Sequence, residues 1–279
     1  MHRACCLGGR VDVWAPRCGV VHSVFAGAAN LRLGEAWWTL LAADRPDQPS
    51  GIRLASDTAD APETPDARGA RGAAGLPPIR AGSPVVVRAG HLRVGDAVID
   101  CRAATRWAPD AWPVAAPGVE ARLRQLERAA MRRAWAGAPA LAQALCDALD
   151  DDDAALAAAA LCAVGRGPGL TPSGDDVIVG LLTALGMERI LLRERLARAI
   201  APALPTTTAL SRHLIEEAVI GLPGRALHEL GVALLSGRNL AGAAERALEI
   251  GATSGADAVF GLIAGCRHHR RLSSPTPCA

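Results

Sequence analysis

The sequence contains no lysine. Its combined total of 30 lysine and arginine residues consists of arginine alone. Schiff-base catalysis and lysine-anchored phosphate binding are therefore excluded. Arginine instead offers a planar guanidinium group that binds a carboxylate or phosphate through two hydrogen bonds. Aromatic residues make up only 3% of the chain and the net charge is +2, so neither base stacking nor a basic surface indicates a nucleic-acid partner.

Metal-binding cysteine pairs and membrane-length apolar runs are also missing. The eight cysteines form no C-x-x-C pair or other spacing typical of a metal site. No apolar run is long enough for a membrane span, and residues 1–10 lack the apolar core of a signal peptide. These absences favour a cytoplasmic protein with no membrane partner and no metal site.

The hydrophobic pattern changes near residue 105. Before it, short β-rich runs alternate with Gly-containing turns, whereas from Gly118 apolar residues recur at helical spacing. We predict an α+β fold, with a small antiparallel, barrel-like β domain over residues 1–105 and a mostly α-helical domain over 106–279. Residues 55–82 are rich in Ala, Asp, Pro, Gly and Arg, and we expect a flexible insertion there.

Individual elements follow from these patterns. The expected strands are Val11–Trp14, Val20–Phe25, Asn30–Leu33, Trp37–Leu41, Gly51–Leu54, Pro84–Arg88, Leu92–Val94 and Ala97–Asp100. In the second half, Val119, Leu123, Leu126 and Ala130 share one helix face. The acids Asp150–Asp153 are better explained by a helix N-terminus than by a metal site, and Arg267–Arg271 is expected to be a solvated basic tail.

One stretch organises the helical half: Gly165–Asp176, which reads G-R-G-P-G-L-T-P-S-G-D-D before an apolar run. Its glycines permit left-handed backbone conformations, and Ser173 with Asp176 forms a Ser-x-x-Asp capping pattern. A capped helix after a turn would explain those two residues alone. The full loop instead predicts a helix N-terminus that binds an anion. It is not a Walker A loop, since the Gly-Lys-Ser/Thr end is missing.

The pattern Ser-Gly-x-Asp-x-x-x-Gly-Leu occurs a second time, from Ser254 to Leu262. In both copies a glycine, Gly180 or Gly261, lies one helical turn after the aspartate. Glycine within a helix is costly, so we expect close packing against another backbone. We infer two helix N-termini that meet or line one cleft, with a third candidate start at Thr206–Thr208.

The central motif and its second copy resemble the AllH-like family, long catalogued only as a domain of unknown function. Supporting similarities lie in Val21–Leu31, Gly51–Leu54 and Thr206–Ser211. The family includes a subunit of oxamate carbamoyltransferase of anaerobic allantoin breakdown, a step of purine catabolism, which works with two other subunits. The resemblance thus implies a hetero-oligomeric transferase that moves a carbamoyl group between oxamate (as oxalurate) and phosphate.

The residues are compatible with this chemistry, since helix N-termini and arginine suit a small anionic substrate and an aspartate accepts hydrogen bonds from an NH₂ group. The catalytic candidates are Asp175, Asp176 and Asp257. His22 is included among the binding residues, although a structural strand histidine explains it better. The substrate-binding candidates are His22, Arg166, Gly167, Gly169, Thr171, Ser173, Gly174, Thr207, Ser254 and Gly255.

Three interpretations stay open. The chain is a catalytic subunit, or it is a non-catalytic anion-binding or assembly subunit whose partner performs the chemistry. No cofactor is required by the first interpretation. A third interpretation is a Mg²⁺-dependent phosphate-handling enzyme that uses Asp175 and Asp176, since paired acids suit hard cations.

Overall fold

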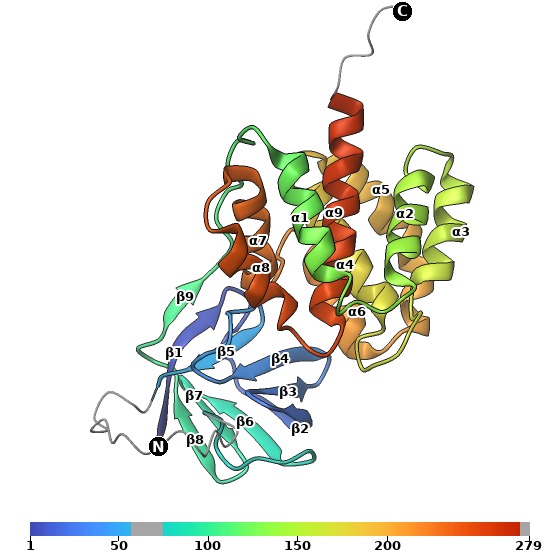
Figure 1. The fold of residues 1–279 in the computed structure, drawn as a ribbon. Helices are drawn as coiled ribbons and strands as arrows, with labels where there is room; N and C mark the ends of the chain where they lie inside the picture. The colour runs from blue at the N-terminus through green and yellow to red at the C-terminus, as the bar shows by residue number, and fades with distance from the viewer. Residues whose placement is uncertain (57–74, 274–279) are drawn as a thin grey trace, which may run out of the picture. The chain divides into compact units, whose positions relative to one another are not determined.

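The computed structural model describes residues 1–56 and 75–273 and divides into two compact units, Met1–Ala108 and Pro109–Ala279 (Figure 1). The first unit is built from β-strands and the second from α-helices. The predicted α+β class, with a barrel-like β part before a helical part, is therefore confirmed.

The first unit is a sheet that closes on itself. Its strands are ordered β5-β4-β3-β2-β6-β7-β8-β1, a pairing of β1 with β5 closes the ring, and β9 adds to β1. Apolar side chains alternate toward the interior, as in β6, where Val85 and Val87 are buried and their neighbours are exposed. The strands are β1 (His2–Gly8), β2 (Arg17–Phe25), β3 (Ala28–Leu33), β4 (Ala36–Leu41), β5 (Gly51–Leu54), β6 (Pro84–Arg88), β7 (His91–Val94), β8 (Ala97–Asp100) and β9 (Thr105–Trp107).

The sheet is mixed rather than wholly antiparallel. The hairpins are antiparallel as expected, but β1 runs parallel to β8 and β9, and β4 runs parallel to β5. The prediction of a strand at Val11–Trp14 is wrong: that segment bends, while its Val11 and Val13 side chains enter the core. The first strand of the structure is β1, whose sequence contains no β-branched residue.

Most of the expected insertion at 55–82 falls on residues 57–74, which lie outside the described residues. The part that follows is held to the barrel, because Leu76 and Ile79 pack against its hydrophobic core.

The second unit contains a layered bundle of helices. The predicted face of Val119, Leu123, Leu126 and Ala130 is the buried face of α1. Asp152 caps α3 by accepting a hydrogen bond from the Ala155 amide at 2.9 Å, as expected for a helix N-terminus. The helices are α1 (Val119–Ala130), α2 (Ala138–Ala148), α3 (Asp153–Ala163), α4 (Ser173–Glu188), α5 (Ile190–Ile200), the 3₁₀ helix η2 (Ala201–Thr206), α6 (Ala209–Val219), α7 (Arg225–Ser236), α8 (Leu240–Leu248) and α9 (Ser254–Ser273).

The centre of this unit is the pair α4 and α9, which begin at the two copies of the repeated motif (Figure 1). A Cβ atom on Gly180 would lie 1.8 Å from the Ala258 carbonyl oxygen, and one on Gly261 would lie 1.9 Å from the Val177 carbonyl oxygen. Each glycine therefore admits the backbone of the other helix, which confirms the expected reason for glycine inside a helix.

The prediction of a solvated tail at Arg267–Arg271 is wrong at its first two residues, because α9 continues through them. Arg267 pairs with Glu127 of α1 through two hydrogen bonds of 2.8 and 3.0 Å and lowers the pKa of that carboxyl. His268 is buried and lies 2.9 Å from Asp150. These two side chains therefore contact an acid of α1 and an acid in the turn between α2 and α3.

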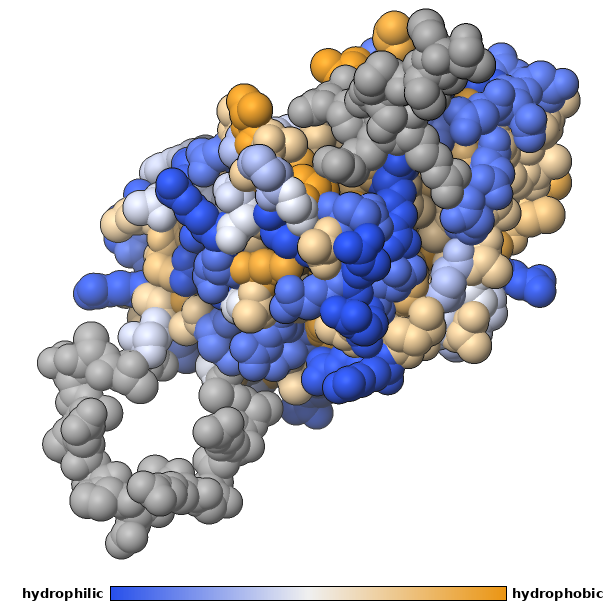
Figure 2. All heavy atoms as spheres, turned by 45° about the horizontal axis from the view of Figure 1, so that its top comes forward, coloured by the Kyte–Doolittle hydropathy of each residue, from blue (hydrophilic) through white to orange (hydrophobic). Residues whose placement is uncertain are grey.

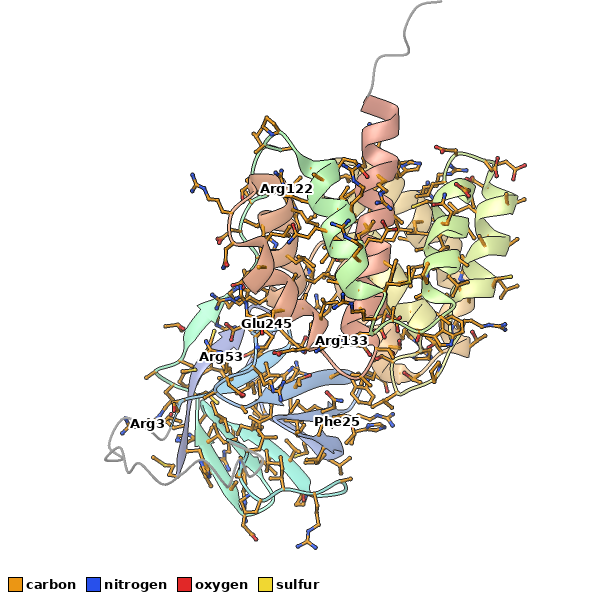
Figure 3. All side chains as sticks on the ribbon, in the orientation of Figure 1. Arg3, Phe25, Arg53, Arg122, Arg133 and Glu245 are labelled. Carbon is orange, nitrogen blue, oxygen red and sulfur yellow. The ribbon has the colours of Figure 1, made fainter. Side chains whose placement is uncertain are left out.

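Arginines also hold the helical unit together by binding backbone carbonyl groups. Arg122, labelled in Figure 3, donates to the carbonyl groups of Ala116, Pro117, Leu234 and Leu235 at 2.7 to 3.2 Å. It thus links the start of α1 to the end of α7.

The face drawn in Figure 2 mixes hydrophilic and hydrophobic residues in small patches. Among the described helices, none is long and apolar enough to cross a bilayer.

Candidate functional site

Three helix N-termini meet around the loop of residues 167–172, those of α4, α6 and α9. The loop is tightly wound, with φ values of +99° at Gly167 and +103° at Gly169, where side chains would be strained. Its middle is tied to α6, because the Thr208 hydroxyl donates to the Leu170 carbonyl oxygen at 2.8 Å. Thr208 also caps α6 by accepting a hydrogen bond from the Ser211 amide at 3.0 Å.

Asp175 anchors this junction. One oxygen of its buried carboxylate accepts from the Gly165 amide at 2.8 Å. The other accepts from the Ser211 hydroxyl at 2.6 Å and from the Thr207 hydroxyl. The side chain therefore joins the end of α3, the start of α4 and the start of α6, which makes the predicted third helix start part of the junction.

Asp176 faces the second copy of the motif. Thr171 Oγ1 lies 3.3 Å from Asp176 Oδ2 and 2.9 Å from Ser254 Oγ at the start of α9. Burial raises the pKa of the Asp176 carboxyl, and the nearby carboxylates of Asp257 and Asp175 raise it further. The two repeated helix starts therefore do meet, and their aspartates act on each other electrostatically.

Asp257 is fully buried and only half satisfied. Its Oδ1 atom accepts from the Trp135 amide at 2.8 Å, whereas Oδ2 has no hydrogen-bond partner among the described residues. The hydroxyl of Ser173 is likewise buried, and no described residue forms a hydrogen bond with it. Buried polar atoms normally find partners, so these two atoms stand out as unsatisfied hydrogen-bonding groups at the junction.

The repeat extends from the sequence to the three-dimensional contacts. The Gly174 amide donates to the Arg166 carbonyl oxygen at 2.8 Å, and the Gly255 amide donates to that of Ile250 at 2.9 Å. A Cβ atom on either glycine would lie 2.0 Å from a carbonyl oxygen of the preceding helix. The copies differ in the connecting loop, since residues 167–172 stand where the second copy has only 251–253. The longer loop distinguishes the first copy.

The structure corrects the role given to Ser173. Helix α4 begins at Ser173 after Pro172, and no side chain caps it. Ser173 is therefore not the N-cap of a Ser-x-x-Asp pair.

The other two candidates lie at the surface. Arg166 is exposed at the start of the loop. His22 belongs to the barrel unit, where it is exposed on β2 with its ring centroid 4.9 Å from that of Trp37 in an edge-on contact. That contact fits a structural strand histidine.

Two members of the junction were not assigned roles from the sequence. Ser211 stands four residues after Thr207, so both hydroxyls reach Asp175 across the start of one helix. The four-residue spacing of Thr207 and Ser211 at a helix start is the sequence feature that could have identified Ser211. The Trp135 amide, by contrast, is a backbone group far along the chain, and nothing in the residue types marks it as a partner of Asp257.

The fold and this site define a class of protein that has a β-barrel unit followed by a helical unit. In the helical unit, two helices begin with the same Ser-Gly-x-Asp motif, and the aspartates of the two motifs interact. The AllH family N-terminal domain matches residues 9–106, and the family described as oxamate carbamoyltransferase subunit AllH matches residues 163–266. The chain belongs to the AllH-like family. Searches of curated proteins and of solved structures gave no match.

Proposed function

We propose that this chain is a subunit of a carbamoyltransferase that moves a carbamoyl group between oxamate, as oxalurate, and phosphate. The family is named for a subunit of oxamate carbamoyltransferase, which supports assembly with other subunits. The observation that carries the proposal is the Oδ2 atom of Asp257, which has no hydrogen-bond partner in the described part of the chain and whose carboxylate acts on that of Asp176 at the start of α4, after the glycine-rich loop and the exposed Arg166.

The reaction needs groups that bind and orient rather than a covalent nucleophile. In the direction of breakdown, a phosphate oxygen attacks the ureido carbonyl carbon of oxalurate. The bond from that carbon to the oxamate nitrogen breaks, and the proton that the attacking hydrogen phosphate gives up goes to this nitrogen, so that the products are oxamate and carbamoyl phosphate. Asp257 Oδ2 is suited to accept a hydrogen bond from the carbamoyl NH₂ group, while Arg166 is suited to an anion. Positioning of this kind supplies much of the barrier reduction in two-substrate reactions.

A non-catalytic anion-binding or assembly subunit is the second candidate function, and Asp175 favours it. Both oxygens of this carboxylate already accept hydrogen bonds from the protein, so the group serves the junction. The same observation weakens a magnesium role for Asp175 and Asp176. No group of three or more His, Cys, Asp or Glu side chains able to hold a metal ion occurs in the described part of the chain.

The test is phosphate-dependent breakdown of oxalurate by the isolated chain and by the complex with its partner subunits. We expect turnover only in the complex. Asp176→Asn and Asp257→Asn should each lower that turnover by about 100-fold, a magnitude typical of removing one group that binds the transition state. The double variant should lose little more, because groups acting on one ligand behave as a unit.

Two variants serve as controls. Asp151→Asn changes an exposed acid on the turn before α3 and should leave turnover unchanged. Asp175→Asn should instead lower the free energy of unfolding by about 1–3 kcal/mol, because it places an amide NH₂ among hydrogen-bond donors. Full turnover by the isolated chain would contradict the subunit proposal. Small, additive effects of Asp176→Asn and Asp257→Asn would favour the assembly subunit.

A further inference from the structure

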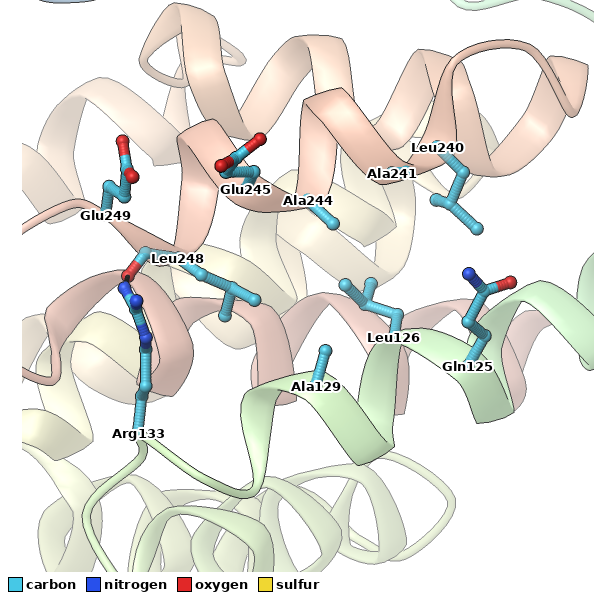
Figure 4. A pocket seen from close by; sticks show the side chains of 10 residues that line it. All are labelled: Gln125, Leu126, Ala129, Arg133, Leu240, Ala241, Ala244, Glu245, Leu248 and Glu249. Atoms are coloured by element: carbon cyan, nitrogen blue, oxygen red, sulfur yellow. Dashed lines mark hydrogen bonds between the residues drawn. The ribbon is translucent and has the colours of Figure 1, made fainter.

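A groove lies between α1 and α8 in the helical unit. It has a volume of about 350 Å³. Its floor is apolar and consists mainly of Leu126 and Ala129 on one side and Leu240, Ala244 and Leu248 on the other (Figure 4). Leu126 and Leu248 are buried. A groove of this size accommodates a few apolar side chains of a partner.

The groove exists because small residues face each other. Ala129 on α1 and Ala244 on α8 leave space that neighbouring leucine side chains do not fill (Figure 4). At one end the two elements are tied together, since Arg133 Nη1 donates to the Leu248 carbonyl oxygen at 3.0 Å. This hydrogen bond links the segment after α1 to the end of α8 at one end of the groove.

The α8 side of the groove is acidic. Glu245 and Glu249 both line it, and they lie four residues apart, on one face of the helix. Both are exposed, and neither has an ion pair or hydrogen bond to its carboxylate within residues 1–56 and 75–273. Arg246, between them in sequence, is engaged elsewhere with Glu229 at 2.9 Å.

We infer that this groove binds an amphipathic helix of a partner protein that presents leucine-sized side chains flanked by arginine or lysine. Apolar side chains would occupy the floor between α1 and α8, as in other helix-in-groove complexes. A basic side chain would pair with Glu245 and Glu249, whose spacing suits one guanidinium group between two carboxylates. The inference rests on the proposed function only in taking the partner to be another subunit of the complex.

The experiment uses the full chain and two fluorescent synthetic peptides of about 20 residues, long enough to be partly helical. Both carry leucine at the same helical spacing, but one has arginine and the other glutamate at the flanking positions. Fluorescence anisotropy at low salt should show binding of the arginine peptide at least tenfold tighter than that of the glutamate peptide. Neither measurement involves carbamoyl transfer, so failure here is distinct from failure of the proposed function.

Variants locate the binding. Ala244→Trp should fill the groove and abolish binding of the arginine peptide, and Glu245→Gln with Glu249→Gln should weaken it about tenfold without disturbing the fold. Glu216→Gln, an exposed acid on α6, should bind like the parent. Equal binding of both peptides, no binding of either, or unchanged binding by the double Gln variant would overturn the inference. Self-association of the parent that Ala244→Trp abolishes would make the occupant a second copy and would also overturn it.

Discussion

Asp176 is a carboxyl group buried beside two other carboxylates, Asp175 and Asp257, and this arrangement has a consequence for stability. Its raised pKa means that the folded protein keeps a proton at pH values where the unfolded chain has released it. Within that window the stability of the protein falls as pH rises, and the loss is complete once pH exceeds the folded-state pKa. Below the ordinary pKa of aspartate, both states are protonated and the effect vanishes.

We therefore predict that Asp176→Asn removes a pH-dependent part of stability. The difference in free energy of unfolding between the parent and the variant should change by up to about 1.4 kcal/mol per pH unit above pH 4, in the direction that disfavours the parent as pH rises. Urea unfolding between pH 4 and pH 8 measures this difference. Asp151→Asn should run parallel to the parent, and a constant difference for Asp176→Asn would contradict the prediction.

Arg166 is the exposed cation beside the glycine-rich loop, and it can be tested without a partner subunit. Phosphate or carbamoyl phosphate should raise the melting temperature of the parent, since a ligand that binds the folded state stabilises it. Arg166→Gln should weaken binding by about tenfold or more, because a charge-assisted hydrogen bond contributes about 1.5–3 kcal/mol.

A melting series over phosphate concentration gives the apparent Kd of each variant. Arg128→Gln, an exposed arginine of α1, is the matched control and should behave as the parent. An unchanged Kd for Arg166→Gln would place the anion site elsewhere. Substitution of Gly169 is a poor alternative, because its φ of +103° would strain any side chain.

At the scale of the elements, the contact of α4 with α9 depends on glycine. Gly180→Ala or Gly261→Ala would place a methyl group less than 2 Å from a backbone carbonyl oxygen, and a helix backbone cannot yield as a flexible side chain does. We predict a loss of about 3 kcal/mol or more of unfolding free energy for each variant. Chemical denaturation measures it.

Gly186 near the end of α4 provides the control. A Cβ atom there would lie 3.2 Å from Nη1 of Arg193, the far end of a flexible side chain. Gly186→Ala should therefore be neutral or stabilise by up to about 1 kcal/mol through helix propensity. The double variant of Gly180 and Gly261 should cost less than the sum, since separating the helices relieves both clashes. Equal effects at all three positions would show that close packing is not the cause.

At the scale of the whole molecule, each unit has a hydrophobic core of its own. We predict that residues 109–279 expressed alone are helical by circular dichroism and unfold in one cooperative transition. The hydrophobic core of the helical unit is formed by residues between Val119 and Cys266, so Gly261→Ala should destabilise the fragment as it destabilises the full chain. A fragment that is unfolded, or that melts without cooperativity, would contradict this prediction.

Much of the fold follows from local patterns. Alternation and turns located most barrel strands, and helical spacing located the buried face of α1, because these features depend on neighbouring residues only. The repeated Ser-Gly-x-Asp-x-x-x-Gly-Leu motif also predicted that two helix starts meet, since glycine within a helix needs a reason and close packing is the common one.

Contacts between distant residues decided the rest. β1 has alanine, cysteine and leucine rather than β-branched residues, and it is a strand because β5, β8 and β9 pair with it. The basic residues that begin at Arg267 resemble a solvated tail in the sequence. In the structure they belong to α9, and the Arg267 side chain binds Glu127.

The site divides in the same way. The sequence by itself determined which aspartates stand at helix starts. Only the tertiary structure decided that Asp175 accepts hydrogen bonds from Gly165, Thr207 and Ser211, while one oxygen of Asp257 has no partner among residues 1–56 and 75–273. The physical reason is that hydrogen-bond satisfaction depends on which donors the fold brings within about 3 Å, and sequence distance does not reveal that.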